Sequence, residues 1–155
     1  EKIVKPGDII LAQIIRRTFH EFNAPMDGTV YSDPTTDHLF ELFQTPKSQL
    51  FVAEVDGEIL GCCGIFPTVG LPNGCTEIVK FYMAKAGRGK GYGKALYHAC
   101  EQKAIALNYQ QLYIESIPEF STAIGLYQKL GFEPLKGPLG KSGHFGCNVW
   151  LLKTL

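Results

Sequence analysis

The chain has 155 residues, 45% of them hydrophobic, and its equal numbers of basic and acidic residues give a formal net charge of zero. This length suits one domain with a single sizeable core, which we place over residues 1–155. A neutral total argues against a general nucleic-acid binder, which needs an excess of positive charge. No apolar stretch approaches the roughly twenty residues of a membrane-spanning helix and no signal-like segment opens the chain, so we expect a soluble, cytoplasmic protein.

The charge is distributed unevenly along the chain. Residues 1–79 contain five basic and eleven acidic residues, and residues 80–155 contain ten basic and four acidic ones, so the halves carry −6 and +6. Two interpretations stay open. The charges are solvated and intermixed in the folded protein, or the C-terminal half holds an anion while the N-terminal half meets a cation.

The first third of the chain predicts two helices separated by a long polar connection. Residues 3–4 are typical of the end of a strand, and Pro6-Gly7-Asp8 begins a helix after it. The connection over residues 23–32 lacks a regular pattern, and such connections often line substrate sites. Asp33-Pro34 supplies an N-cap and a first helical residue for a second, short helix. The side chains expected to point inward are Ile10, Ile14, Ile15, Leu39, Leu42 and Phe43.

The middle of the chain predicts a β-hairpin and a further strand. Residues 50–55 and 58–66 are joined by Asp56-Gly57, a dipeptide typical of two-residue hairpin turns. A third strand is expected over residues 75–83. Strict alternation would place Ile78, Lys80 and Tyr82 on one face and Glu77, Val79, Phe81 and Met83 on the other.

A glycine-rich basic stretch follows this strand and precedes a helix expected over residues 91–107. It reads Arg88-Gly89-Lys90-Gly91-Tyr92-Gly93-Lys94. The glycines leave backbone N–H groups uncovered, and the positive end of the helix dipole adds to their effect. A tight turn on a solvated basic patch is the plainer interpretation, but it does not require so many glycines and basic residues together. We therefore expect the stretch to hold an anion such as a phosphate.

The rest of the chain completes a mixed sheet. It predicts a strand over residues 112–115, a helix over 122–130 that Gly131 ends, a Gly/Pro-rich connection over 137–146 and a strand over 148–153. The order of the elements predicts an α/β (α+β) fold. We expect a central, mostly antiparallel sheet with one parallel crossover at the glycine-rich stretch and about four flanking helices.

The spacing of the glycines excludes two common phosphate-binding loops. A Walker loop would place Gly at position 88 and Ser or Thr at position 95, where this chain has Arg88 and Ala95. The dinucleotide pattern G-x-G-x-x-G fails as well, because Tyr92 or Lys94 stands where its last glycine should be.

The spacing Arg88-x-x-Gly91-x-Gly93 is similar to the R/Q-x-x-G-x-G/A motif of the GNAT superfamily of acetyl-CoA-dependent N-acetyltransferases. Residues 77–83 resemble the fourth strand of that family, and residues 123–132, Ala-Ile-Gly-Leu-Tyr-Gln-Lys-Leu-Gly-Phe, resemble its second signature. The N-terminal half is similar only in the order of its elements. Many members have Asn where Phe120 stands, so one side-chain contact to the pantetheine arm of CoA is expected to be absent or replaced.

The resemblance implies a GNAT-like fold that binds acetyl-CoA as its co-substrate. Backbone groups of residues 81–83 would grip pantetheine, and N–H groups of residues 89–94 would surround the pyrophosphate. Arg88, Lys90 and Lys94 would add positive charge. The predicted cofactor-binding residues are Phe81, Tyr82, Met83, Arg88, Gly89, Lys90, Gly91, Tyr92, Gly93 and Lys94.

Acyl transfer from a thioester to an amine needs a base, a polarised carbonyl and a proton for the departing thiolate. Tyr127 matches the tyrosine that serves the leaving group in the family. Glu77 is the first choice of base by resemblance, because it stands at the position of the fourth strand where some protein-acetylating members carry a catalytic glutamate. Burial among apolar neighbours would raise its pKa toward the working range. Glu115, on the next strand, is the rival because other members carry theirs there, and a water relay or an already neutral amine stays open. An N–H group near Met83 would polarise the carbonyl, again by resemblance.

The resulting hypothesis is an N-acetyltransferase that moves acetyl from acetyl-CoA to a primary amine by direct attack in a ternary complex. The alternative is a non-catalytic acyl-CoA-binding module acting as a sensor or partner, which would not need Tyr127, Glu77 and Glu115 together. The acceptor stays open between a cationic small amine, slightly favoured by the −6 half, and a peptide amine. We expect no nucleic-acid or membrane partner, and a homodimer stays open.

The cysteines are Cys62, Cys63, Cys75, Cys100 and Cys147. They include no CxxC pair, so they suggest neither a disulfide framework nor a zinc site, and most are expected to be small buried hydrophobes. His144 and Cys147 could form a metal pair or a Cys-His nucleophile. No further ligand is apparent near them, and the surrounding glycines indicate a mobile loop, so we expect no metal.

Overall fold

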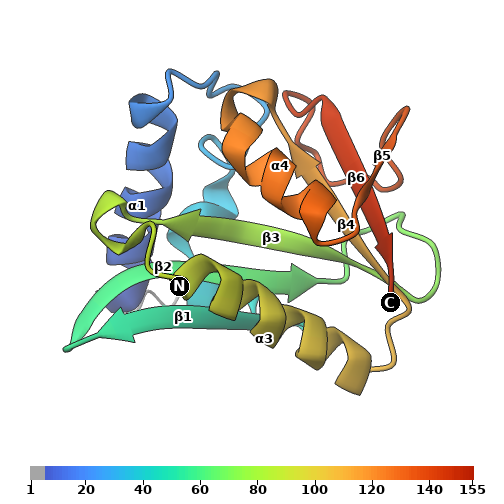
Figure 1. Cartoon of the computed structure of the whole chain (residues 1–155), viewed down its shortest axis with the longest axis horizontal. Helices are drawn as coiled ribbons and strands as arrows, with labels where there is room; N and C mark the ends of the chain where they lie inside the picture. The colour runs from blue at the N-terminus through green and yellow to red at the C-terminus, as the bar shows by residue number, and fades with distance from the viewer. Residues whose placement is uncertain (1–5) are drawn as a thin grey trace.

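The computed structural model describes residues 6–155 and shows a six-stranded mixed sheet with helices on both faces (Figure 1). The strand end expected at residues 3–4 lies outside the described residues. The elements are α1 (Pro6–Glu21), η1 (Pro34–Asp37), α2 (Leu39–Leu42), β1 (Gln49–Val55), β2 (Glu58–Phe66), β3 (Cys75–Met83), η2 (Lys85–Gly87), α3 (Tyr92–Ala106), β4 (Gln111–Ser116), η3 (Pro118–Phe120), α4 (Ser121–Lys129), β5 (Glu133–Leu135) and β6 (Val149–Thr154).

The strand order is β1-β2-β3-β4-β6-β5, and every neighbouring pair is antiparallel except β3 and β4. The predicted mixed sheet with one parallel crossover is therefore confirmed. Asp56 and Gly57, which join β1 to β2, both have positive φ angles of 51° and 81°. Two left-handed residues in a two-residue loop match the right-handed twist of the strands that they connect.

Each face of the sheet carries its own hydrophobic core, so there are two cores rather than the single core expected. Cys63 and Ile78 belong to the core beneath α3 and α4, whereas Cys62 belongs to the core beneath α1. Ile14 and Ile15 of α1 are buried as predicted, but the prediction for Ile10 is wrong, since 40% of it is exposed. The buried stripe of α1 runs through Leu11, Ile14, Ile15, Thr18 and Phe19. This is the spacing of a single helical face.

The second predicted helix is split in two. Asp33 caps η1 as expected, its side chain accepting a hydrogen bond from the backbone N–H of Thr35. His38 then leaves the helical region with a φ of −135°, so α2 begins separately at Leu39. Leu39 is fully buried, and it anchors this short segment against the core beneath α1.

Strand β3 contains one extra residue, and this overturns the predicted alternation. Cys62 pairs with Tyr82 while Gly64 pairs with Val79, so three steps on β3 face two on β2. Lys80 lies at this bulge with a φ of 53°. A bulge reverses the faces of the side chains that follow it. Phe81 and Met83 consequently join Ile78 in one core, while Lys80 and Tyr82 lie on the α1 side.

The parallel strands β3 and β4 pair over a short distance only. Their register is Cys75↔Gln111, Thr76↔Leu112 and Glu77↔Tyr113. Beyond Glu77 the two strands diverge (Figure 1), β3 continuing beside β2 and β4 beside β6. The edge of β3 that faces β4 therefore lacks a strand partner from residue 78 onward. Backbone groups on such an edge are available to a ligand.

Residues 6–155 contain no helix that is both long enough and apolar enough to cross a membrane.

Candidate active site

A cavity of about 880 Å³ lies where β3 and β4 diverge. Its walls include both strands, the glycine-rich stretch and α4, together with residues of three connections. One end is formed by the glycine-rich stretch at the start of α3. The other end contains the ionisable side chains Asp33, Glu77, Lys80, Glu115 and His144. The cavity thus joins an end with glycines and a helix start to an end with ionisable side chains.

The glycine end offers a row of uncovered backbone donors. The N–H groups of residues 89–94 make no hydrogen bond within residues 6–155, and the first such bond at the start of α3 runs from Ala95 N to Gly91 O. Gly89 and Gly91 have φ angles of 76° and 84°, which strain any residue with a side chain. These donors lie at the positive end of a 15-residue helix, so the stretch suits an anion.

The Arg88 side chain lies against α1. Its Nε donates to the Met83 carbonyl at 3.0 Å, and its terminal nitrogens donate to the Glu21 carboxylate at 2.7 and 3.3 Å. The guanidinium also lies 5.4 Å from the ring centroid of Phe22. Arg88 therefore fastens the end of β3 to α1, whereas Lys90 and Lys94 are exposed.

Tyr127 of α4 lies in the cavity wall, with its ring 6.0 Å from that of Phe81. Its hydroxyl makes no hydrogen bond to the part of the chain that the structure describes. Burial, together with the nearby Cys63, raises the pKa of Tyr127 well above its ordinary value. The phenol therefore keeps its proton and is available as a donor to a ligand in the cavity.

Phe120 belongs to an aromatic cluster on the same wall. Its ring lies 5.2 Å from Phe19, 5.8 Å from Phe22 and 6.1 Å from Tyr82, in edge-to-face geometry. Since Phe has no polar side-chain atom, this position offers an apolar surface rather than a hydrogen bond to whatever occupies the cavity.

Glu77 is buried at the end of the paired part of β3, with 3% of its surface exposed. The Thr68 hydroxyl donates to its Oε1 at 2.6 Å, and Oε2 has no hydrogen-bond partner among residues 6–155. Burial raises the pKa of Glu77 to about 7, with a further increase from Glu115 that the Thr68 hydrogen bond opposes. The carboxyl can therefore gain and lose a proton near neutral pH.

Glu115 of β4 lies nearby, but both of its oxygens are engaged. The Tyr113 hydroxyl donates to Oε2 at 2.7 Å, and the Ser142 hydroxyl donates to Oε1 at 2.5 Å. Ser142 also accepts a hydrogen bond from the backbone N–H of His144. Glu115 thus holds the connection before β6 against the sheet.

Asp33 links a buried lysine to a histidine. Its Oδ2 lies 2.6 Å from His144 Nε2 and 3.5 Å from Lys80 Nζ, and Lys80 also donates to the hydroxyls of Thr35 and Thr36. Burial opposes the ionisation of Asp33, but the hydrogen bond with His144 and the charge of Lys80 hold its pKa well below its ordinary range. Burial lowers the pKa of Lys80, against the effect of Asp33. The contacts of Asp33 favour an ion pair between its carboxylate and the Lys80 ammonium group.

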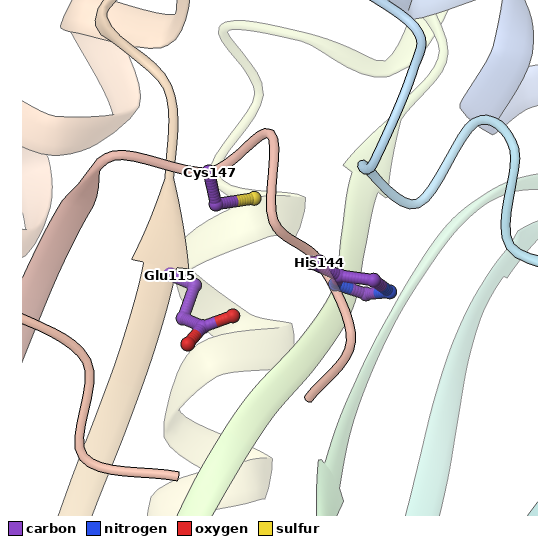
Figure 2. A group of neighbouring side chains, drawn as sticks. All are labelled: Glu115, His144 and Cys147. Atoms are coloured by element: carbon purple, nitrogen blue, oxygen red, sulfur yellow. The ribbon is translucent and has the colours of Figure 1, made fainter. Parts of the chain in front are cut away.

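His144 and Cys147 gain a third neighbour that their sequence spacing did not reveal. Donor atoms of Glu115, His144 and Cys147 all lie within 4.8 Å of one another (Figure 2). Burial raises the pKa of Cys147 to about 12, with further contributions from Glu115 and Glu77. The thiol is therefore protonated at neutral pH, which disfavours the Cys-His nucleophile. The other four cysteines are free and buried, as predicted for most of them.

The predicted site residues line this cavity, apart from Lys90, which is exposed, and Tyr92. Thr68, Lys80 and Ser142 were not predicted as members of the site, and Asp33 was predicted only as a helix cap. The one sequence feature that could have indicated Lys80 was its position inside a mostly apolar strand. The bulge that turns Lys80 toward Asp33 is not readable from residue type.

Comparisons with known proteins identify similar sequences and similar folds. The model of the Acetyltransferase (GNAT) family matches residues 13–132. The uncharacterized N-acetyltransferase YjgM of Escherichia coli K12 is 34% identical over 146 residues, which cover 94% of this chain and 87% of that protein.

Two solved structures illustrate the similarity in fold. A GNAT-family acetyltransferase from Staphylococcus aureus Mu50 superposes with a TM-score of 0.86 at 20% identity, over 100% of this chain and 97% of that one. The PaiA N-acetyltransferase of Thermoplasma acidophilum, solved with coenzyme A, gives a TM-score of 0.75 at 14% identity, over 100% and 97% of the two chains. At these identities the likeness concerns the fold.

Replacing Glu77 by Gln should stabilise the protein at alkaline pH. The folded pKa of about 7 lies above the ordinary value of 4.5, so the folded state holds this proton more tightly than the unfolded state. The favourable contribution is complete below pH 4.5 and is lost as the pH rises through 7. Above pH 7, burying the charge costs up to about 3 kcal/mol, which Glu77→Gln removes.

Urea unfolding of wild type and Glu77→Gln at pH 5 and pH 8 checks this prediction, with exposed Glu58→Gln as the matched control. The free energy of unfolding of Glu77→Gln should exceed that of wild type at pH 8 and approach it at pH 5. Equal stabilities of the two proteins at both pH values would contradict it.

Proposed function

The chain belongs to the GNAT acetyltransferase family, and we propose that it transfers the acetyl group of acetyl-CoA to a primary amine by direct attack in a ternary complex. Family membership makes it an acetyl-CoA-dependent acyltransferase; the amine acceptor and the order of events are our proposal. One observation carries it. A single cavity is lined by the helix start with uncovered N–H groups, by a buried carboxyl with a pKa of about 7 and by the Tyr127 ring.

The cavity suits an extended ligand with an anionic end. The N–H groups of residues 89–94 would receive the pyrophosphate of acetyl-CoA, and the unpaired edge of β3 from residue 78 onward would receive the amide groups of its pantetheine arm. Acetyl-CoA supplies an activated acyl group as a thioester. What the protein adds is its orientation toward the ionisable end of the cavity.

Glu77 is the proposed base. The acceptor arrives as an ammonium ion, and the carboxylate takes one proton so that the nitrogen lone pair can attack the thioester carbonyl. Its free Oε2 and its pKa of about 7 suit this role. Glu115 suits it less, because both of its oxygens already accept hydrogen bonds from Tyr113 and Ser142.

Tyr127 is the proposed partner of the departing sulfur. The nitrogen–carbon bond forms, the carbon–sulfur bond breaks, and the thiolate takes the second proton of the amine. Overall, an ammonium ion and acetyl-CoA give an amide, CoA thiol and one released proton. Because burial raises the pKa of Tyr127 well above that of a thiol, its main contribution is a hydrogen bond to the sulfur rather than complete proton transfer.

A compact cationic amine fits the acceptor end best. Asp33, Glu77 and Glu115 place three carboxyl groups there, against the two lysines Lys80 and Lys141. The connections around this end are also linked to one another, by Gly146 N to Gly28 O and by Lys141 N to Val69 O, each at 2.7 Å. A cavity bounded by linked connections favours a small amine over a long peptide.

Incubation with acetyl-CoA and a panel of amines tests the proposal. The panel should contain diamines, amino acids, aromatic amines and peptides with free lysine or N-terminal amines, with released CoA thiol as the readout. We expect turnover with at least one small amine. Titration calorimetry with CoA runs in parallel, and binding of CoA without transfer to any amine would instead favour the non-catalytic acyl-CoA-binding module.

Replacing Tyr127 by Phe should slow transfer by about 10²-fold while leaving the Kd for CoA nearly unchanged. The substitution removes the hydroxyl but keeps the ring that packs on Phe81 and Phe132. Tyr109→Phe is the matched control, since its hydroxyl donates to Lys47 O outside the cavity. Wild-type kcat in Tyr127→Phe would remove this hydroxyl from the reaction.

The base is identified by pH profiles of kcat/KM. In wild type, kcat/KM should rise with pH through an inflection near 7, as Glu77 loses its proton. Glu77→Gln should lower kcat/KM by about 10²-fold or more and abolish this inflection. Glu115→Gln, the matched variant across the cavity, should retain it. The reverse pattern would assign the base to Glu115, and an inflection in both variants would indicate a water relay.

A further inference from the structure

We propose that Glu115, His144 and Cys147 form a binding site for a zinc ion at the acceptor end of the cavity. Figure 2 shows the three side chains gathered where β4 meets the connection that precedes β6. A carboxylate oxygen, a ring nitrogen and the sulfur all lie within 4.8 Å of one another. His144 and Cys147 are also three positions apart, a spacing from which two side chains of one loop can reach the same ion.

The three ligand atoms lie close enough to one another to bind a single ion after a small movement. In a tetrahedral zinc site with bonds of 2.0–2.3 Å, ligand atoms lie roughly 3.3–3.5 Å apart. The atoms must therefore approach each other by at most roughly 1.5 Å. His144 and Cys147 lie on a connection that contains Gly143 and Gly146, and Gly143 has a positive φ of 81°. Rotation of the three side chains, with a small movement of the connection at Gly143, would bring the atoms to these distances.

Neighbouring residues already orient two of the three ligands. Asp33 Oδ2 lies 2.6 Å from His144 Nε2, which leaves Nδ1 as the ring nitrogen without a partner among residues 6–155. A histidine that binds zinc characteristically donates its other N–H to such a carboxylate. Tyr113 and Ser142 fix the Glu115 carboxylate, whose oxygens keep further lone pairs for an ion. These contacts resemble the outer shell of a metal site.

The ligand types favour zinc over magnesium and calcium. Magnesium and calcium prefer oxygen ligands throughout, whereas one sulfur, one nitrogen and one carboxylate suit zinc. Binding would displace the thiol proton of Cys147 to solvent. Because all three residues line the cavity, the fourth coordination position would open toward the space assigned to the acceptor. An ion there would occupy that space and neutralise the Glu115 charge.

Zinc should therefore compete with the amine. This second statement rests on the proposed function, whereas zinc binding itself does not. Binding is measured first, on the full chain without acetyl-CoA, by competition with a chromophoric chelator. We expect one zinc ion per chain and no comparable binding of magnesium. Cobalt should bind in its place and show a thiolate-to-cobalt charge-transfer band in the near ultraviolet.

Cys147→Ser and His144→Gln should each weaken zinc binding at least about tenfold, and Cys147→Ser should lose the cobalt band. His98→Gln, an exposed histidine on α3 outside the cavity, is the matched control and should bind as wild type does. Circular dichroism confirms that each variant is folded. Absence of one-to-one zinc binding in wild type, equal binding in Cys147→Ser, or a cobalt complex without the thiolate band would overturn the site.

Competition is tested with an amine that turns over. Zinc should raise the apparent KM for the amine in wild type and have at least about tenfold less effect on Cys147→Ser, which also controls for zinc captured by CoA thiol. Zinc that binds as described but leaves this KM unchanged would refute the competition alone. Absence of any turnover would count against the proposed function, and the binding and cobalt results would stand independently.

Discussion

The short pairing of β3 with β4 is the constraint on which the rest of the structure depends. Three residue pairs hold these parallel strands together, and Glu77 belongs to the last of them. Beyond that point the sheet opens, and the two strands continue against different partners, β2 and β6. A sheet that stayed closed would bury the β3 edge and leave no cavity. The opening places a buried carboxyl at its apex and an unpaired backbone edge along its side.

The bulge in β3 sets the electrostatics of the opening. Without the extra residue, Lys80 would point into the core beneath α3 and α4, where an unpaired ammonium would be strongly unfavourable. With it, Lys80 reaches Asp33 and the hydroxyls of Thr35 and Thr36. Its charge offsets part of the negative charge of three neighbouring carboxyl groups. Burial, rather than charge alone, then keeps the Glu77 pKa near 7.

Patterns that depend on neighbours in sequence predicted the fold well. The Asp56-Gly57 turn, the glycine-rich stretch and the α4 signature each combine local residue types with a local geometry, and the sheet with its parallel crossover followed from their order. The bulge at Lys80 and the break at His38 were not predicted, because backbone torsions there depend on tertiary packing. Glu77 was predicted to be the base from a resemblance, and the structure adds that its burial raises its pKa.

The contacts between distant segments could not be predicted. Thr68, Asp33 and Ser142 join the site through hydrogen bonds across 9, 111 and 27 residues, and no periodicity encodes such distances. The same is true of Glu115 beside His144 and Cys147. Side chains that meet in this way can be recognised as one site only in the folded structure.

The two ends of the cavity are built from different kinds of structure. The end proposed to bind acetyl-CoA consists of a strand edge and a helix start that the sheet and its cores hold in place, whereas much of the end proposed to bind the acceptor comes from connections around Asp33, Thr68 and Ser142. Connections accept insertions and substitutions more readily than packed elements. If these segments bind the acceptor as proposed, their variation can change the acceptor during evolution, or in an engineered library, while the glycine-rich end of the cavity and the fold are retained.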